Sequence, residues 1–180
     1  MVRIDRLLEQ ESVRHVINVP NTDGVTALHL TVENRRYYWA KALLEAKADP
    51  NLRTRLCPPI TPLEGVLLQQ RDHENLPVLR LLLEHKAQTH TAAETSPLYL
   101  AVRGGLFASA QALLTAKASV YGTNLSQPPL LHVVVATTNS HTLDLDQALL
   151  HHHADVHATH QGKSVLETAV DIYWRRSSVL

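Results

Sequence analysis

The stretch Asn21-Thr22-Asp23-Gly24-Val25-Thr26-Ala27-Leu28-His29-Leu30 contains the pattern on which the predicted fold rests. Asp23-Gly24 is a tight-turn dipeptide, and Thr26 can cap a helix that buries Leu28 and Val32 one turn apart. The core of the pattern is a small hydroxyl residue, a turn-compatible residue, a leucine and a polar residue. It returns as Thr61-Pro62-Leu63-Glu64, Ser96-Pro97-Leu98-Tyr99 and Ser164-Val165-Leu166-Glu167.

The copies are evenly spaced. Those beginning at Thr26, Thr61 and Ser96 start 35 residues apart, and 68 residues, about two such intervals, separate Ser96 from Ser164. A further copy is therefore expected near position 130, where Pro128-Pro129-Leu130-Leu131 lacks the hydroxyl. A fixed period of this size predicts a stack of repeated units rather than a globule around one core.

A second motif follows each copy: a leucine pair, three variable residues, an alanine and usually a polar residue. It occurs at residues 43–49, 82–88, 113–119 and 149–155. Between Trp39 and Leu44 the apolar residues leave Lys41 and Glu45 for solvent, which predicts a helix with one inward face. Neither predicted helix can hide its apolar face alone, so neighbouring units must stack.

The two motifs in constant order resemble the ankyrin repeat, whose signature is a period of 33 with T-P-L-H-x-A on the first of two helices. The resemblance covers roughly residues 17–176. It implies an all-α fold, an ankyrin-repeat solenoid of stacked helix-turn-helix repeats joined by β-hairpin-like loops. We expect one domain, 1–180, with full repeats at 21–52, 53–91, 92–122 and 123–158 and partial or capping repeats at 1–20 and 159–180.

The chain departs from the family pattern in two ways. Extra residues at 70–75 and 137–142 are expected to project as loops between paired helices. The glycine that usually ends the second helix in a left-handed conformation is replaced by Lys47, Lys86, Lys117 and His153. Such a replacement costs about 1 kcal/mol, and a cation near a helix C-terminus recovers about 0.3–1 kcal/mol of it. The alternative is a lysine row that binds an acidic partner.

Composition excludes several classes of function. Lys plus Arg and Asp plus Glu number 17 each, so nothing favours nucleic acid. No continuous apolar run of about 20 residues predicts a membrane span, and no secretory core follows Met1. The single Cys57 excludes an internal disulfide. The expected location is cytoplasmic or nuclear, with delivery into a host cell left open.

Catalytic and metal sites are not expected. No nucleotide-binding, G-x-S-x-G or H-E-x-x-H string occurs, and nothing near Cys57 would activate it as a nucleophile. His153 and His157 have the spacing of a metal-chelating pair on one helix, but His153 is predicted to end its helix. We therefore predict no enzyme activity, no cofactor and no metal site, with adventitious metal binding as the alternative for the cluster at residues 151–160.

By resemblance, His29 is expected to bond to backbone between adjacent repeats. In the same register, the residues that replace it are Glu64, Tyr99, Leu131 and Glu167. A position that varies this much is not expected to be catalytic.

The resemblance also implies where a partner would bind, because ankyrin repeats usually make contacts through hairpin tips and exposed first-helix positions, which form a concave groove. Carried over to this chain, this selects Asp23, Val25, Glu33, Ile60, Leu68, Gln69, Thr95, Arg103, Leu125, Gln127, Val135 and Lys163. Four of them form an apolar middle of the kind expected in a binding hot spot: Ile60, Leu68, Leu125 and Val135. The alternative is that these apolar groups fill the core of an irregular second repeat. A rival patch is Arg35-Arg36-Tyr37-Tyr38-Trp39, in which Tyr37 and Trp39 are predicted to be buried.

The predicted function is a protein–protein interaction module that binds a partner protein through the groove, as scaffold, adaptor or inhibitory mask. The alternative is a targeting or regulatory domain of a larger enzyme or pathogen effector whose activity lies outside this chain. The chain is expected to be monomeric apart from its partner, with no nucleic acid and no membrane bound. Leu7, Leu8 and Val13 are expected to cover the first repeat, and polar residues 175–178 to finish the last helix.

Overall fold

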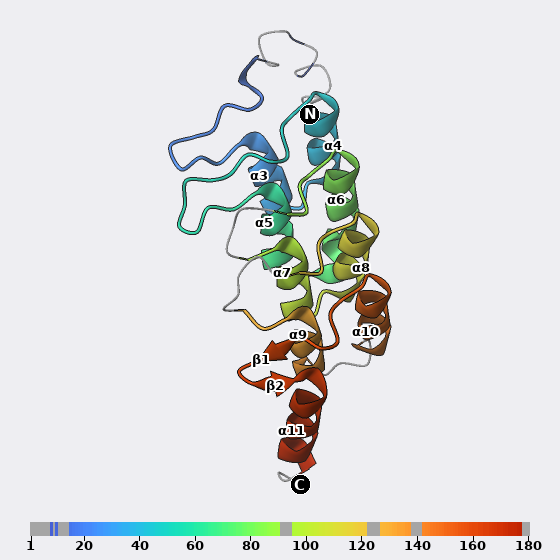
Figure 1. The fold of residues 1–180 in the computed structure, drawn as a ribbon. Coiled ribbons are helices and arrows are strands. Elements are labelled where there is room, and N and C mark those ends of the chain that lie inside the picture. The colour runs from blue at the N-terminus through green and yellow to red at the C-terminus, as the bar shows by residue number, and fades with distance from the viewer. Residues whose placement is uncertain are drawn as a thin grey trace. The chain divides into compact units, whose positions relative to one another are not determined.

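The computed structural model describes residues 8, 10, 15–90, 95–121, 127–137 and 142–177. The chain forms two compact units, Met1–Gln88 and Thr89–Leu180. Each unit is built from helix pairs, and we call the members of a pair the first and the second helix. Figure 1 shows the helices and a pair of short strands.

The first unit contains two complete pairs in its described part. They are α3 (Ala27–Glu33) with α4 (Tyr37–Glu45), and α5 (Pro62–Leu68) with α6 (Asp72–Glu84). Each first helix packs on its own second helix, α3 packs on α5, and α4 packs on α6. First and second helices therefore form two adjoining layers.

The second unit repeats this arrangement and adds a hairpin with a final helix. Its elements are α7 (Pro97–Arg103), α8 (Phe107–Thr115), α9 (Leu130–Ala136), α10 (Thr142–His151), β1 (Thr159–His160), β2 (Lys163–Ser164) and α11 (Val165–Ser177). The strands are antiparallel, with His160 opposite Lys163. α7 packs on α8 and α9, α10 packs on α8 and α9, and α11 packs on α9.

Hydroxyl side chains cap the first helices α3, α5 and α7, as the sequence predicts. Thr26 accepts a hydrogen bond from the backbone N–H of His29, and Thr61 and Ser96 cap α5 and α7 in the same way. In α3 and α5 the side chain of the third helical residue, His29 or Glu64, also accepts a hydrogen bond from the backbone N–H of the N-cap residue. Both partners of this capping box satisfy N–H groups that a helix end leaves unpaired.

The second helices end in the predicted left-handed conformation. φ is 73° at Lys47, 65° at Lys86, 62° at Lys117 and 64° at His153. The alanine that follows each of these residues donates its backbone N–H five residues back, as in Ala48 N to Leu43 O at 2.9 Å. This bond satisfies a terminal carbonyl of the helix, and the prediction for the four non-glycine residues is confirmed.

The core consists of the leucines of the two sequence motifs. They are Leu28, Leu63, Leu98 and Leu131 on first helices and Leu43, Leu82, Leu113 and Leu149 on second helices, all buried. Burying each such side chain contributes about 1.5–3 kcal/mol. Leu8 is also buried, whereas Leu7 and Val13 lie outside the described residues.

Two local predictions are wrong. Most of segment 70–75 belongs to α6, which starts at Asp72 and has 13 residues against nine in α4. Asp72 and Glu74 favour helix there because carboxylates stabilise a helix N-terminus. Trp39 is 46% exposed, because the buried face of α4 is Ala40, Leu43 and Leu44. Tyr37 is half-buried, and residues 138–141 of the other extra segment lie outside the described part.

The fourth copy of the first motif is displaced by one residue from the predicted alignment. Pro129 is the N-cap of α9, and the helix begins at Leu130. His132 is therefore the third helical residue, the place that His29 holds in α3. The prediction that Leu131 stands in the histidine position is wrong, because without a hydroxyl residue the run Pro128-Pro129-Leu130-Leu131 fits both alignments.

Candidate partner-binding surface

Two buried histidines tie a first helix to the hairpin of the next repeat. In the first unit, His29 Nε2 lies 3.2 Å from the carbonyl oxygen of Ile60. In the second unit, His132 Nε2 lies 3.1 Å from the carbonyl oxygen of Lys163. Each bond spans 31 residues of sequence. The inter-repeat role expected for His29 is confirmed, and His132 has the same role.

The other ring nitrogen of His29 is also hydrogen-bonded. His29 Nδ1 lies 2.9 Å from Thr26 Oγ1 and accepts from the Thr26 backbone N–H at 3.3 Å. Burial lowers the pKa of His29, and the hydrogen bond to the Ile60 carbonyl opposes that shift in part. The neutral imidazole, with its proton on Nε2, fits these contacts.

His132 lacks this local support. Its N-cap is Pro129, which offers neither a hydroxyl nor a backbone N–H. Within the described part of the chain, the buried His132 Nδ1 has no hydrogen-bond partner. Its ring lies beside that of His160, with centroids 6.1 Å apart and planes inclined at 69°.

A hollow of about 490 Å³ opens next to His132 in the second unit. Helix α7, helix α9, the β1–β2 hairpin and helix α11 surround it. Its lining residues are Tyr99, Arg103, Pro128, His132, Val133, Ala136, Thr137, His160, Gln161, Lys163, Thr168, Asp171 and Ile172. The lining combines apolar side chains with charged ones on the same surface.

Hydrogen bonds and one ion pair fix the hairpin side of the hollow. Lys163 Nζ pairs with Asp171 Oδ2 across the start of α11. The Glu167 carboxylate accepts from the Ser164 backbone N–H at 2.7 Å and from the Ser164 hydroxyl at 2.8 Å. These two bonds lower the pKa of Glu167. Arg103 ends α7 with an exposed side chain, so its guanidinium is the cation most available to a ligand.

Three comparisons, with family patterns, with related sequences and with solved structures, each find an ankyrin repeat protein. The family described as Ankyrin repeat matches residues 23–55. A putative ankyrin repeat protein of Rickettsia bellii (strain RML369-C) is 35% identical over 89 residues, which cover 48% of this chain and 25% of that protein. The crystal structure of EF0377, an ankyrin repeat protein, aligns with a TM-score of 0.73 at 19% identity, over 97% of this chain and 92% of that one.

Residues 23–55 are an ankyrin repeat, and the whole chain has the fold of an ankyrin repeat protein. Its fold class is the predicted one, an all-α ankyrin-repeat solenoid. Ankyrin repeats generally act as protein–protein interaction modules and are typically non-enzymatic. The match to the Rickettsia protein spans about a quarter of that protein's length.

In the second unit of this ankyrin-repeat chain, the hollow brings together two of the predicted contact residues, Arg103 and Lys163. Thr95 and Gln127 bond to each other instead, with Gln127 Nε2 donating to Thr95 Oγ1 at 2.9 Å. Val135 is half-buried on α9, and Leu125 lies outside the described residues.

In the first unit, the predicted residues are spread over hairpin and helix positions. Gln69 Nε2 donates to the carbonyls of Val32 and Glu33 at 3.2 and 3.3 Å, so this amide links two repeats. Leu68 is 52% exposed and does not fill the core of the second repeat. The remaining positions are Asp23 and Glu33, exposed, and Val25 and Ile60, half-buried.

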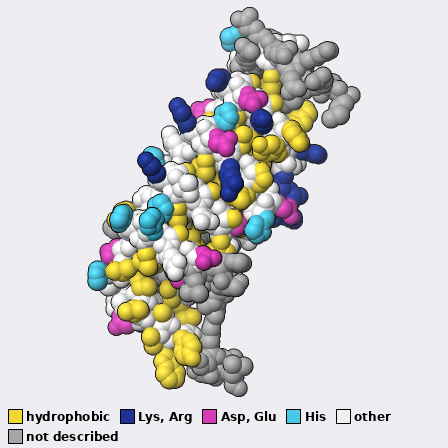
Figure 2. All heavy atoms as spheres, turned by 90° about the vertical axis from the view of Figure 1, so that its right-hand side faces the viewer, with side chains coloured by type: hydrophobic (Ala, Val, Ile, Leu, Met, Phe, Trp, Pro, Cys, Tyr) yellow, Lys and Arg dark blue, Asp and Glu magenta, His cyan; other side chains and the backbone are white. Residues whose placement is uncertain are grey.

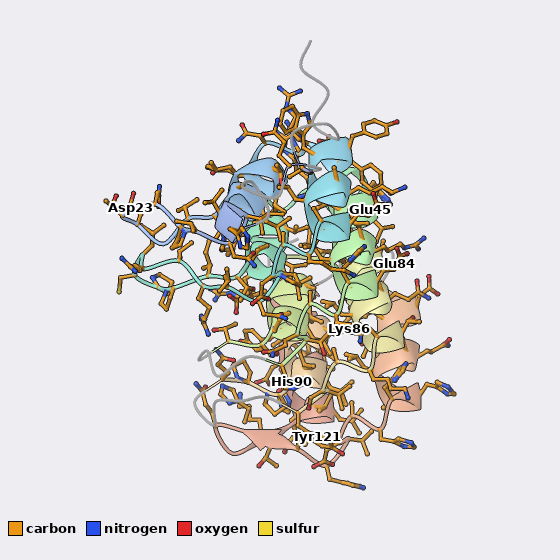
Figure 3. The ribbon with its side chains drawn as sticks, turned by 90° about the horizontal axis from the view of Figure 1, so that it is seen from above. Asp23, Glu45, Glu84, Lys86, His90 and Tyr121 are labelled. Carbon is orange, nitrogen blue, oxygen red and sulfur yellow. The ribbon has the colours of Figure 1, made fainter. Side chains whose placement is uncertain are left out.

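The first unit presents its hairpins away from its second helices. Seen from above, Asp23 lies at the tip of a projecting loop, and Glu45 and Glu84 lie on the opposite side (Figure 3). The tip is held by backbone bonds, including Arg55 N to the Asp23 carbonyl at 2.6 Å. The exposed Asp23 agrees with the expectation that hairpin tips are accessible to a partner.

The lining residues that sequence reasoning did not select as contact positions include His132 and Tyr99. Spacing could have found His132, which follows Tyr99 by 33 residues and precedes Glu167 by 35.

The histidines at residues 151–160 are arranged as predicted. α10 ends at His151, and the left-handed His153 separates it from His157. His157 donates its backbone N–H to Asp155 Oδ1 at 2.8 Å. Over the described ranges, no three His, Cys, Asp or Glu side chains are grouped so that they could hold a metal ion. None of the described helices is long and apolar enough to cross a membrane.

Proposed function

We propose that this chain binds a partner protein through the hollow of its second unit, and thereby acts as scaffold, adaptor or inhibitory mask. The supporting observation is the hollow itself, whose lining combines apolar side chains with charged ones. Concave sites with few, well-placed polar groups are typical of recognition. The mechanism is surface complementarity, with no bond made or broken.

The lining defines the partner segment that would fit. Val133, Ala136 and Ile172 offer apolar lining for one apolar side chain. Lys163 is already paired with Asp171, so among the described lining residues we assign an acidic group of the partner to Arg103. The proposed ligand is therefore a short segment with an apolar anchor next to an aspartate or glutamate.

The length of the Rickettsia relative supports a wider version of the proposal. Because the match covers 25% of that protein, repeats of this kind occur within longer chains. Within such a chain the module would target or regulate an activity located elsewhere. A cytoplasmic or nuclear location, and a monomeric state apart from the partner, belong to the same proposal.

Site-specific photo-crosslinking in cells of the source organism tests the hollow. A photoreactive phenylalanine at Gln161, on the rim, should give a discrete protein adduct. Arg103→Glu in the same chain should reduce the adduct at least fivefold, because it replaces the cation with a like charge for an acidic ligand. The same probe at the exposed Glu84 on α6 is the matched control. Equal adducts at Gln161 and Glu84, or an adduct that Arg103→Glu leaves unchanged, would contradict the proposal.

A further inference from the structure

His29 is a buried histidine, 7% exposed, and both of its ring nitrogens are hydrogen-bonded. Nε2 lies 3.2 Å from the carbonyl oxygen of Ile60, and Nδ1 accepts from the Thr26 backbone N–H at 3.3 Å. Other histidine side chains lie on the surface of the molecule, as Figure 2 shows, and His73 and His157 are exposed. A proton added to His29 therefore meets surroundings unlike those of the exposed imidazoles.

The second proton of His29 would go to Nδ1, because Nε2 already carries the proton that it donates to Ile60. The Thr26 hydroxyl, 2.9 Å from Nδ1, can turn to accept the new N–H. The Thr26 backbone N–H would then lose its acceptor and face a second donor. Protonation thus adds a buried charge and leaves one backbone donor without a partner, and both changes cost free energy.

The pKa of His29 is shifted in the direction that this cost requires. Burial lowers the pKa from its ordinary value of 6.5, and the smaller, opposing effect is that of the hydrogen bond to the Ile60 carbonyl. The folded chain therefore binds this proton less readily than the unfolded chain. Stability linked to His29 is fully present above pH 6.5 and is lost as the pH falls from there through the lowered value.

The charged groups around His29 are mostly engaged with one another. Helices α4 and α5 pack on α3, which carries His29. The titratable side chains of these three helices and of the hairpin before α5 are, besides His29, Glu33, Tyr37, Tyr38, Lys41, Glu45, Arg53, Arg55, Cys57 and Glu64. Lys41 Nζ lies 3.8 Å from Glu45 Oε1, and Arg53 Nη2 lies 3.9 Å from Glu64 Oε2. The pKa shift of His29 arises from burial and a backbone carbonyl, not from a charged side chain.

The carbonyl that His29 binds also closes the hairpin of the second repeat. The Ile60 carbonyl accepts from the Thr54 N–H at 3.0 Å, and the Thr54 hydroxyl accepts from the Ile60 N–H at 3.0 Å. A charged imidazole gains solvation only by leaving its buried place, and that movement breaks its bond to Ile60. We propose that His29 is an acid-sensitive link, which holds residues 53–60 against α3 at neutral pH and releases them at mildly acidic pH.

The second unit contains a matched comparison. His132 makes the same bond, to the Lys163 carbonyl at 3.1 Å, but its Nδ1 accepts no hydrogen bond within the described part of the chain. A proton on that nitrogen displaces no donor there. We therefore expect the acid-induced release in the first unit, with α9 and the β1–β2 hairpin unchanged. The proposal does not depend on the hollow, which lies in the second unit.

Hydrogen exchange of the full chain at pH 7.5 and pH 5.0 tests the link, with labelling times scaled to equal intrinsic exchange. Residues 53–60 include no Asp, Glu or His, so an effect of acid on their amides must originate outside the segment. The Thr54 N–H is the direct reporter, because it shares the Ile60 carbonyl with His29. We expect its exchange to accelerate about threefold or more at pH 5.0, and exchange in residues 128–137 and 159–168 to change less than about twofold.

His29→Gln removes the titrating group and keeps a side-chain N–H for the Ile60 carbonyl. In this variant the pH dependence of residues 53–60 should disappear. His73→Gln, which replaces an exposed histidine of the same unit, should retain it. If His29→Gln does not fold, NMR of the unmodified chain takes its place, and the His29 imidazole and the Thr54 amide should then titrate with one midpoint.

Three exchange results would overturn the proposal. The first is exchange in residues 53–60 that does not depend on pH, and the second is an acceleration that His29→Gln retains. The third is equal acceleration in both units, which would indicate a global loss of stability. In the NMR experiment, separate midpoints for the imidazole and the Thr54 amide would have the same meaning.

Discussion

In the first repeat, Thr26 caps α3 and its hydroxyl meets His29 Nδ1, whereas in the fourth repeat Pro129 precedes α9 and leaves His132 Nδ1 without a partner among the described residues. Both histidines nevertheless bond through Nε2 to a hairpin carbonyl 31 residues further on. The hydrogen bond between repeats is therefore present even where the N-cap hydroxyl that holds the histidine ring is absent. Helix capping and the bond between repeats can thus occur independently in this motif.

The second helices of the two repeats differ in a similar way. In α4, Ala40 is fully buried three residues before Leu43. In α10, Asp146 stands three residues before Leu149, half-buried and with a buried, unpartnered Oδ1 among the described atoms. The leucine is buried in both helices. The fourth repeat thus keeps the core leucine while one neighbouring core position carries a carboxylate.

The largest effect should come from moving the carboxylate into the first repeat. Ala40→Asp places an unpaired charge at a fully buried position, and we expect a loss of about 3–5 kcal/mol of unfolding free energy. Urea denaturation measures the loss, with the exposed neighbour Lys41→Asp as control. A loss below 1 kcal/mol would mean that α4 accommodates a charge there as α10 does.

Removing the cap hydroxyl should make the first repeat resemble the fourth. Thr26→Val leaves His29 Nδ1 and the His29 N–H without Thr26 Oγ1, and should cost about 1–2 kcal/mol. The reverse change, Pro129→Thr, should gain about 0.5 kcal/mol, because the new cap outweighs the lost rigidity of proline in the unfolded chain. Thermal unfolding of both variants measures the pair. The same sign for both changes would refute the equivalence of the two caps.

Replacing the carboxylate of the fourth repeat should stabilise the chain. Burial raises the pKa of Asp146 above its ordinary value of 3.8, so the folded state disfavours the ionised form. Stability linked to this group is present below the ordinary value and is lost as pH rises through the raised value. Asp146→Ala should therefore gain about 1 kcal/mol at pH 7, and the gain should vanish at pH 3.5. Denaturation at both pH values, with Asp144→Ala as the exposed control, measures it; a gain independent of pH would point to packing instead.

The smallest expected difference concerns the helix ends, where the two repeats are alike. Lys47 and His153 both have left-handed backbone, with φ of 73° and 64°. Glycine adopts this conformation without steric cost, so Lys47→Gly and His153→Gly should each gain about 0.5–1 kcal/mol. Calorimetry of the single and double variants tests both size and additivity. A loss at either position would show that its side chain makes a contact worth more than the backbone strain.

Sequence reasoning located what depends on local chemistry. The hydroxyl caps and the leucine pairs follow from propensities of short segments, and the left-handed Lys47 follows from the resemblance to the ankyrin repeat. All are observed. The alignment at Pro129 failed because one missing hydroxyl left two registers equally good. Trp39 was misplaced because helical periodicity allows a residue at the edge of the buried face to point either way.

The candidate site was less accessible to sequence reasoning. Arg103 and Lys163 were selected by their place in the repeat, and both line the hollow. Gln69 and Gln127 were selected on the same grounds, yet their amides bond to neighbouring repeats. Whether a polar side chain faces solvent or an adjacent repeat depends on the distances between repeats. Composition and the spacing of motifs in the sequence do not determine those distances.

The shared 31-residue offset of the histidine bonds has a consequence for how such a gene can lengthen. Donor and acceptor lie in successive copies of one period, so duplication of a whole period in the DNA would recreate a donor and an acceptor at the same offset. An insertion of another size between donor and acceptor would change that offset. A duplicated copy of a repeat that carries the histidine would therefore bring its link to the next repeat with it.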